Sequence, residues 1–239
     1  MRRILAISDI HGCLIPFKEM LGKTEYDPKK DLLILMGDYM DRGPQSRETL
    51  SLVIELAKDG AVALRGNHDQ MFLDWLSGNH SSNDLHFFMN GGFATISSYL
   101  GYGWFKENGY DEELVQKAKE YIRSHYQEHI EFLSELDYFY ETKEYIFVHA
   151  GINPLIEDWR YTDIYDYIWI RDGFLHTDHH YAFTVIHGHT PARLLHKRND
   201  IFFGNKKIGI DGSCAYGGQL NCLEITEAGF RQYTIRNQI

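Results

Sequence analysis

The stretch that decides the fold is residues 32–43, LLILMGDYMDRG. Its first five residues form a continuous apolar run, and a glycine then leads into two aspartates and an arginine. An apolar run without period-2 alternation is typical of a parallel strand that is buried on both faces. The stretch therefore predicts a buried strand that places acidic side chains at its carboxyl end.

The sequence on either side of this stretch alternates between strand and helix patterns. Residues 4–8 and 61–64 are short apolar runs, and residues 16–21 and 46–58 have apolar positions at helical spacing. Continuous apolar strands separated by helices indicate a parallel sheet. The predicted fold class is α/β.

Helical patterns dominate from residue 70 to about residue 136. Apolar residues 71, 72, 75 and 76 recur at helical spacing, and residues 112–136 contain neither proline nor glycine, which predicts one long helix. We expect a helical insertion that caps the sheet. Because no repeat or proline-rich linker interrupts the chain, residues 1–239 are expected to form one domain, with the insertion at about residues 70–136.

Strand patterns return after residue 137. Residues 138–140 and 145–148 are expected to form a hairpin. Residues 183–186, 207–210 and 220–225 are further apolar runs of strand length. Together they predict a second sheet that packs face to face on the first.

Charge and composition restrict the class of partner. The chain has 24 Lys and Arg against 34 Asp and Glu, a formal net charge of −10. Coating an extended nucleic acid requires many Lys and Arg, so that partner is excluded, whereas a small anionic substrate in one local site is not. No apolar run approaches the ~18 residues of a membrane span. Three cysteines without close paired spacing favour free thiols and a cytoplasmic location.

Polar residues follow the predicted strands at the points where the strands end. Asp38 follows Asp9 by 29 positions and Asn67 follows Asp38 by 29, about one βαβ unit each. Open α/β sheets bind ligands at the carboxyl ends of their strands. Two later strands lead into His-Ala-Gly and His-Gly-His. The residues expected to converge are Asp9, His11, Asp38, Asn67, His149 and His189.

This mixture of donors predicts a metal site. Carboxylate, amide and imidazole ligands suit Mn, Fe or Zn, with manganese expected first, and the absence of cysteine argues against a structural zinc site. Asp9 and His11 are two positions apart, so on an extended chain both project to the same side. Because six ligands exceed the needs of one tetrahedral ion, the set predicts two divalent ions that share Asp38.

Other histidines have a competing structural explanation. His187 lies two positions before His189, but the Gly-His-Thr motif favours His189 as the ligand. His125 and His129 are at i,i+4 spacing, and without an accompanying glutamate they are expected on a helix surface. A further cluster is expected in a solvated loop: His176, Asp178, His179 and His180.

Taken together, the motifs resemble those of the calcineurin-like metallophosphoesterases. Asp-Ile-His-Gly begins at Asp9, Gly-Asp-x-x-Asp-Arg-Gly at Gly37 and Arg-Gly-Asn-His at Arg65, and His-Ala-Gly and Gly-His-Thr follow. Within this superfamily the chain resembles bacterial PPP-type serine/threonine phosphatases and symmetrical dinucleoside tetraphosphate hydrolases. Pro191 stands where the wider phosphodiesterase branch usually has a second histidine, which favours the phosphatase-like branch. Asp69 replaces the glutamate of eukaryotic protein phosphatases, as it does in the dinucleoside hydrolases.

The resemblance implies a fold and a role for each motif residue. The fold is a four-layer α/β/β/α sandwich. One metal would be held by Asp9, His11 and the bridging Asp38, and the other by Asp38, Asn67, His149 and His189. The resemblance makes His68, paired with Asp41, the general acid, and it makes Arg42, Arg65 and Arg171 the residues that bind phosphoryl oxygens.

The implied reaction is hydrolysis of phosphomonoesters by attack of a metal-bridging hydroxide. The first expectation for the substrate is a phosphoserine or phosphothreonine of a protein. The alternative is a dinucleoside polyphosphate, cleaved as by a symmetrical bis(5'-nucleosyl)-tetraphosphate hydrolase. A nonenzymatic metal-binding module is a remote alternative, because the catalytic motifs are all present. The oligomeric state stays open.

Overall fold

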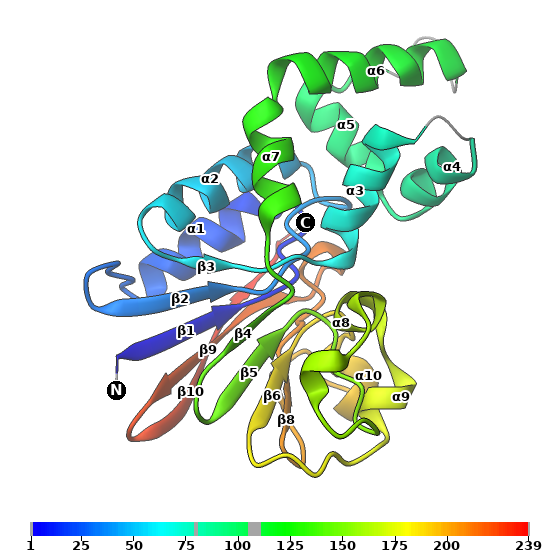
Figure 1. Ribbon diagram of the computed structural model, residues 1–239. Coiled ribbons are helices and arrows are strands. Elements are labelled where there is room, and N and C mark those ends of the chain that lie inside the picture. The colour runs from blue at the N-terminus through cyan, green and yellow to red at the C-terminus, as the bar shows by residue number, and fades with distance from the viewer. Residues whose placement is uncertain (1, 79–80, 105–110, 239) are drawn as a thin grey trace.

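The protein is a sandwich of two sheets with helices on its outer faces (Figure 1). The structure, a computed structural model, describes residues 2–78, 81–104 and 111–238. The first sheet has the strand order β10-β9-β1-β2-β3 and the second the order β4-β5-β6-β8-β7. The strands are β1 Arg3–Ile7, β2 Asp31–Leu35, β3 Val62–Ala63, β4 Phe139–Glu141, β5 Tyr145–Val148, β6 Thr184–His187, β7 Phe202–Phe203, β8 Lys207–Gly209, β9 Gln219–Thr226 and β10 Gly229–Arg236.

Parallel strands form the centre of each sheet. In the first sheet β1 pairs with β2 and β2 with β3, all parallel, and β9 and β10 add antiparallel strands at one side. In the second sheet β5, β6 and β8 are parallel, with antiparallel β4 and β7 at the edges. The carboxyl ends of six parallel strands are therefore available to carry polar loops.

Helices cover the outer face of each sheet and also gather on one side of the sandwich. They are α1 Leu14–Lys23, α2 Ser46–Lys58, α3 Asn67–Ser77, α4 Ser81–Met89, α5 Gly92–Leu100, α6 Glu112–His125, α7 Gln127–Glu135, α8 Ile164–Trp169, α9 Asp172–Leu175 and α10 Ala192–His196. Two short 3₁₀ helices span Trp159–Tyr161 and Cys214–Tyr216.

Three apolar cores account for the four layers. One core joins the first sheet to α1 and α2, with Leu5 and Leu33 against Phe17 and Val53. A second core lies between the sheets and includes residues of both, such as Ile34 of β2 and Ile186 of β6. A third joins β5 and β6 to α8 and α9. The four-layer α/β/β/α arrangement expected from the sequence is confirmed.

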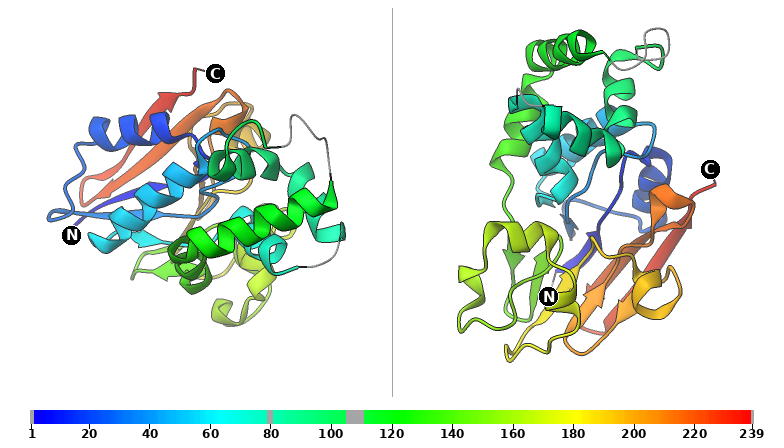
Figure 2. Two further views of the ribbon diagram at one scale, coloured as in Figure 1. Left: turned by 90° about the horizontal axis from the view of Figure 1, so that it is seen from above. Right: turned by 90° about the vertical axis from the view of Figure 1, so that its right-hand side faces the viewer.

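Helices α3 to α7 gather on one side of the sandwich (Figure 2). The prediction of one long helix over residues 112–136 is wrong, because the helix breaks at Tyr126, whose φ of −130° and ψ of 40° are not helical. The Tyr126 ring packs edge-on against Tyr99, with 4.7 Å between ring centroids, and its hydroxyl accepts a hydrogen bond from Arg47. The break lets α7 turn back along α2, where Lys58 pairs with Glu128.

The sequence patterns missed several elements of the second half. The eight-residue strand β10 was not expected, because its residues are mostly polar and exposed. The short elements β7, α8, α9 and α10 were also not expected. Each is too short to show a periodic pattern of its own.

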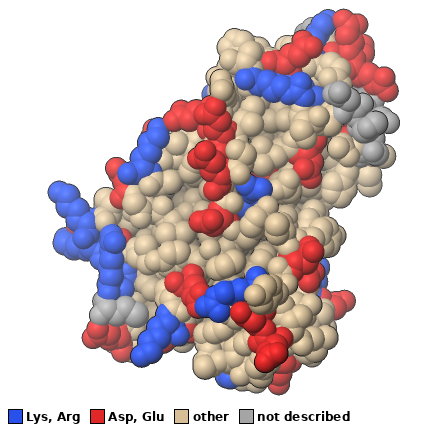
Figure 3. All heavy atoms as spheres, viewed as in Figure 1, with Lys and Arg blue, Asp and Glu red and all other residues tan. Residues whose placement is uncertain are grey.

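Two features of the whole molecule concern its partners. On the face shown in Figure 3, Lys and Arg side chains lie in separate groups with Asp and Glu between them. In the part of the chain that the structure describes, no helix is both long enough and apolar enough to cross a membrane.

Candidate active site

The polar loops of both sheets continue the parallel hydrogen-bond ladder beyond the strands. In the first sheet the amide of Asp9 donates to the carbonyl of Gly37 at 3.2 Å, and that of His11 donates to Asp38 at 2.9 Å. In the second sheet the amide of Gly188 donates to the carbonyl of His149 at 2.8 Å. The strand-end side chains of each sheet therefore lie next to one another, as their spacing predicts.

The two sheets meet at this edge, where only glycine fits at two positions. A Cβ on Gly188 would lie 2.1 Å from Oδ2 of Asp9, which comes from the other sheet. A Cβ on Gly66 would lie 2.2 Å from Oδ1 of Asp38. The glycines of these motifs are thus required by close packing against the carboxylates.

The backbone of the site adopts left-handed conformations at many positions that are not glycine. Positive φ values between 48° and 70° occur at Asp9, His11, Asp38, Asp41, Arg42, His189 and Ser213. Such conformations cost free energy for residues with a Cβ and persist where the surroundings hold them in place. They concentrate here, at the edge where the predicted ligands lie.

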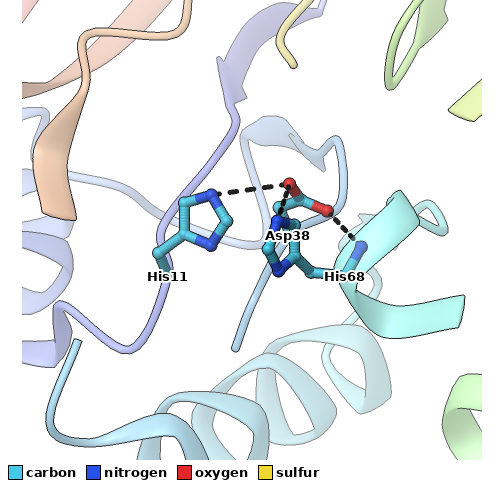
Figure 4. A group of neighbouring side chains, drawn as sticks. All are labelled: His11, Asp38 and His68. Carbon is cyan, nitrogen blue, oxygen red and sulfur yellow. Dashed lines mark hydrogen bonds and ion pairs between the residues drawn. The ribbon is translucent and has the colours of Figure 1, made fainter. Parts of the chain in front are cut away.

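Asp38 lies at the centre of the cluster. Its Oδ2 is 3.5 Å from Nε2 of His11 and 4.0 Å from Nε2 of His68, and its Oδ1 accepts a hydrogen bond from the amide of His68 at 2.9 Å (Figure 4). Asp69 fixes the loop that contains Asp38, because its Oδ2 accepts hydrogen bonds from the backbone amides of Asp38 and Gly66, both at 2.8 Å.

A second group of donors meets the other oxygen of Asp38. Nε2 of His149 lies 3.4 Å from Oδ1 of Asp38 and 3.0 Å from Oδ1 of Asn67. The donor atoms of Asp38, His149 and His189 all lie within 4.8 Å of one another, as do those of His11, Asp38 and His68. Asp38 is therefore common to two groups.

Two of the imidazoles have a fixed tautomer. Nδ1 of His11 lies 2.8 Å from the carbonyl of Met40, and Nδ1 of His149 lies 2.8 Å from the carbonyl of Met36. A carbonyl oxygen can only accept, so each Nδ1 carries the proton and each Nε2 keeps a lone pair directed into the cluster. This second contact through the other ring nitrogen is typical of metal-binding histidines.

Burial determines the electrostatics of the cluster. Burial raises the pKa of Asp9 and Asp38 well above the ordinary range, and in each case a nearby second aspartate raises it further. Burial lowers the pKa of His11, His68 and His189. Carboxylates packed this closely are stabilised in their charged form by a cation, and neutral imidazole is the form that binds metal.

These observations fit a pair of divalent ions. Nε2 of His189 is buried and has no hydrogen-bond partner among the described residues, so it is available as a ligand atom. The donor set of oxygen and imidazole nitrogen suits Mn, Fe or Zn. Asp9 lies 4.0 Å from Nε2 of His11, and its carboxylate also accepts the amide of His189 at 3.0 Å.

His68 and Asp41 form a hydrogen-bonded dyad. Nδ1 of His68 lies 2.7 Å from Oδ2 of Asp41, and both side chains are buried. The other carboxylate oxygen of Asp41 accepts a 2.6 Å hydrogen bond from the hydroxyl of Thr95, a residue of α5. Burial raises the pKa of Asp41 to about 7, against the lowering effects of Thr95 and Arg42.

Of the three expected phosphate-binding arginines, the structure brings two to the cluster. Arg42 and Arg171 line a cavity of about 180 Å³ together with His11 and His189. Nη1 of Arg42 also donates to Nε2 of His11.

Arg65 is placed differently from the expectation. Its guanidinium donates to the carbonyls of Leu133 and Ser134, at 2.8 and 2.6 Å, and to the side chains of Gln70 and Tyr138. Both terminal nitrogens are therefore used to hold α7 and the start of the second sheet against the loop after β3. A phosphate-binding role for Arg65 does not agree with this placement.

The structure adds site residues that the sequence reasoning missed. Asp211 follows β8 at the same edge, is buried, and raises the pKa of Asp9. The rule that identified Asp9 and Asp38, a polar residue after a buried strand, would also have found it. Arg193 and Tyr216 line the cavity beside Arg42. No local signal marks these two residues.

The remaining histidines include two corrections. His129 is buried, not on a helix surface, and it lies between the hydroxyls of Tyr99 and Ser51 at 2.7 and 3.1 Å. His179 is also buried rather than solvated, with Nε2 3.1 Å from the carbonyl of Lys206. His187 packs its ring edge-on against Phe174, away from the donors that surround Asp38.

Comparison with known proteins agrees with this site. Residues 2–228 match the calcineurin-like phosphoesterase family. Serine/threonine-protein phosphatase 1 of Salmonella typhimurium is 30% identical over 234 residues, which cover 94% of this chain and 92% of that protein. The symmetrical bis(5'-nucleosyl)-tetraphosphatase of Thioalkalivibrio sulfidiphilus is 43% identical over 77 residues, 32% of this chain and 28% of that one.

The fold has solved counterparts too. A crystal structure of a protein provisionally named a diadenosine tetraphosphatase superposes with a TM-score of 0.67 at 20% identity, covering 98% of this chain and 94% of that one. At that identity the likeness concerns the fold alone. The match over residues 2–228 and the full-length relative, together with the motifs, establish that this chain belongs to the calcineurin-like phosphoesterase family and is a metal-dependent phosphoric ester hydrolase.

Proposed function

We propose that the protein hydrolyses phosphomonoesters at a centre of two divalent ions, with phosphoserine and phosphothreonine of proteins as its substrates. The observation that carries the proposal is the position of Asp38, whose Oδ2 lies 3.5 Å from Nε2 of His11 and whose Oδ1 lies 3.4 Å from Nε2 of His149. Two ions bound there would make water nucleophilic near neutral pH and offset the charge of the phosphoryl oxygens. The ligands would be Asp9, His11, Asp38, Asn67, His149 and His189.

The side chains around this centre supply the remaining functions. Arg42 and Arg171 would hold the phosphoryl oxygens, because a planar guanidinium can donate two parallel hydrogen bonds to phosphate. His68 would deliver a proton to the departing oxygen, with Asp41 fixing the ring through Nδ1. That arrangement leaves Nε2 of His68 facing Asp38, on the side where the phosphoryl group would lie.

The phosphoprotein substrate is supported by the relative that matches most of the chain. It is also compatible with a groove of about 580 Å³ that begins at Asn67 and runs between α3 and α8. Such a groove is large enough for a side chain and its flanking backbone.

A dinucleoside polyphosphate is the second candidate, and the same groove contains the observation that favours it. Tyr165 and Trp169 stack with 5.9 Å between ring centroids, and Trp169 lies edge-on to His189 at 5.9 Å. Aromatic faces of this kind bind nucleobases by stacking. The chain's similarity to symmetrical tetraphosphatases points in the same direction.

One experiment separates the two candidates. Protein loaded with Mn²⁺ is incubated with a phosphoserine peptide and with diadenosine tetraphosphate, and the release of phosphate and of ADP is followed. We expect phosphate from the peptide. Exclusive formation of ADP would reject the protein phosphatase proposal, and no product from either substrate in metal-loaded protein would reject both.

A further inference from the structure

The cavity beside the metal ligands is lined by more arginines than the proposed reaction uses. Three of its lining residues are arginines, namely Arg42, Arg171 and Arg193, and Asp211 is its one acidic residue. The carboxylate of Asp211 accepts a hydrogen bond from the amide of Ser213 at 2.7 Å, and the residue is buried. The proposed reaction assigns two of these arginines, Arg42 and Arg171, to the phosphoryl group that is hydrolysed.

Arg193 is the arginine that the proposed reaction does not use. It extends from α10, is exposed, and forms no ion pair with any carboxylate of the described residues. Its guanidinium carbon lies 5.9 Å from the centroid of the Tyr216 ring, and that of Arg42 lies 5.0 Å from the same centroid. One ring therefore holds both guanidinium groups beside the same cavity by cation–π contact.

This arrangement forms two adjacent anion positions. The first lies among Arg42, Arg171 and the histidines His11 and His189, all of which line the cavity. The second lies at Arg193, next to the Tyr216 ring. The volume of about 180 Å³ is several times the ~30 Å³ that a water molecule occupies in the liquid, so the cavity has room for more than one small anionic group.

We infer that Arg193, positioned by Tyr216, binds a second phosphoryl group of the substrate, adjacent to the group that is hydrolysed. The inference rests on the proposed function, because it takes the first position to be the reacting phosphoryl group. Two substrate types carry such a pair: the phosphate chain of a dinucleoside polyphosphate, and two neighbouring phosphoserines of one peptide. No bond is made or broken at the second position.

The test compares Arg193→Ala with a matched loss of charge, Arg198→Ala. Arg198 is also an exposed arginine, just after α10, and it does not line the cavity. The substrates are p-nitrophenyl phosphate, a peptide with one phosphoserine, the same peptide with two adjacent phosphoserines, and diadenosine tetraphosphate. We expect Arg193→Ala to raise KM for every substrate that carries two or more phosphoryl groups. This increase should be about ten times the increase for substrates that carry one.

The control and conservative variants sharpen this result. Arg198→Ala is expected to behave as the parent with every substrate. Arg193→Lys keeps the charge but loses the paired hydrogen bonds, and it should fall between the parent and Arg193→Ala. An effect confined to diadenosine tetraphosphate assigns the second position to polyphosphates, and one confined to the doubly phosphorylated peptide assigns it to phosphoproteins. An equal effect of Arg193→Ala on all four substrates would overturn the inference.

Binding measured without turnover separates this inference from the proposed function. Titration calorimetry of the Mn²⁺-loaded protein gives a Kd for inorganic phosphate and a Kd for pyrophosphate. The ratio of these two constants is the preference for two linked phosphoryl groups. Arg193→Ala is expected to reduce that preference about tenfold. If the parent hydrolysed none of the substrates, the proposed function would fail while a reduced preference still supported the second position. An unchanged preference would reject the second position whatever the activity.

Discussion

The edge of the sandwich and the helices α4 to α7, which make up most of the predicted insertion, contribute to the site in different ways. The edge supplies all the proposed metal ligands, and it holds many of them on left-handed backbone packed against glycine. The insertion contacts this edge at a few points. The hydroxyl of Thr95 donates a hydrogen bond to Asp41, and the carbonyl of Gly91 accepts one from the amide of Arg42. Under the proposed function, the sheets fix the metal chemistry, whereas the helices adjust proton transfer and phosphate binding.

The largest expected effect comes from the shared ligand of the sandwich edge. Asp38→Asn removes the charge common to both donor groups, so metal content and activity should both be lost. Elemental analysis after dialysis against Mn²⁺, together with turnover of p-nitrophenyl phosphate, measures this. Asp59→Asn, an exposed aspartate after α2, is the control. Retention of two ions per chain in Asp38→Asn would contradict the shared role of this residue.

His68→Asn tests the dyad that lies between the two regions. We expect metal to stay bound and turnover of an alkyl phosphate to fall by ~10² to 10⁴, because the departing alkoxide loses its proton donor. The loss should be smaller for p-nitrophenyl phosphate, whose leaving group needs no proton. An unchanged rate with the alkyl phosphate would exclude His68 as the general acid.

Thr95→Val tests whether the insertion acts on the dyad. Valine keeps the shape but removes the 2.6 Å hydrogen bond to Asp41, so the His68 ring is held less firmly and kcat for an alkyl phosphate should fall by about tenfold. KM and the rate with p-nitrophenyl phosphate should change less. Ser97→Ala, also on α5, serves as the control. Equal losses with both substrates would assign Thr95 a purely structural role.

The smallest expected effect lies inside the insertion and concerns stability alone. Burial lowers the pKa of His129 from 6.5 to about 4. The Ser51 hydroxyl donates to the carbonyl of Arg47 at 3.0 Å, so it accepts from Nε2, and Tyr99 donates to Nδ1. The pocket therefore fits the neutral ring, and protonation would leave two donors facing each other.

The sign of the pH effect follows from this lowered pKa. The unfolded chain takes up the proton near pH 6.5 and the folded chain only near pH 4. The contribution of His129 is therefore complete above pH 6.5 and is lost as the pH falls through 4, by at most about 3 kcal/mol. His129→Gln should flatten the dependence of Tm on pH between 4 and 6.5, whereas His125→Gln, exposed on α6, should not. Parallel curves for both variants and the parent would contradict this.

The same comparison explains what could be predicted from the sequence. The ligands of the edge follow buried strands at regular spacing, so local patterns were sufficient to bring Asp9, Asp38 and Asn67 together. Arg65 belongs to a motif but points elsewhere, because its partners Leu133 and Ser134 are nearly 70 positions away and no local pattern reveals them.

The insertion was predicted in outline only. Its helical character was evident, but the break at Tyr126 results from packing against Tyr99, which is a tertiary contact. The contact of Thr95 with Asp41 joins residues 54 positions apart and carries no sequence signal. Where function depends on contacts between separate elements, rather than on strand ends, the structure is needed.

The left-handed residues of the edge also bear on which substitutions the protein tolerates. At Ser213, with φ of 60°, glycine or asparagine fits the backbone, whereas valine does not, although Ser213 is not one of the proposed metal ligands. In a library that contains every substitution at these positions, variants would be lost because the backbone conformation excludes them as well as because the side chain acts in the reaction. Intolerance of substitution at this edge therefore does not by itself identify a catalytic residue. Activity has to be measured separately from folding.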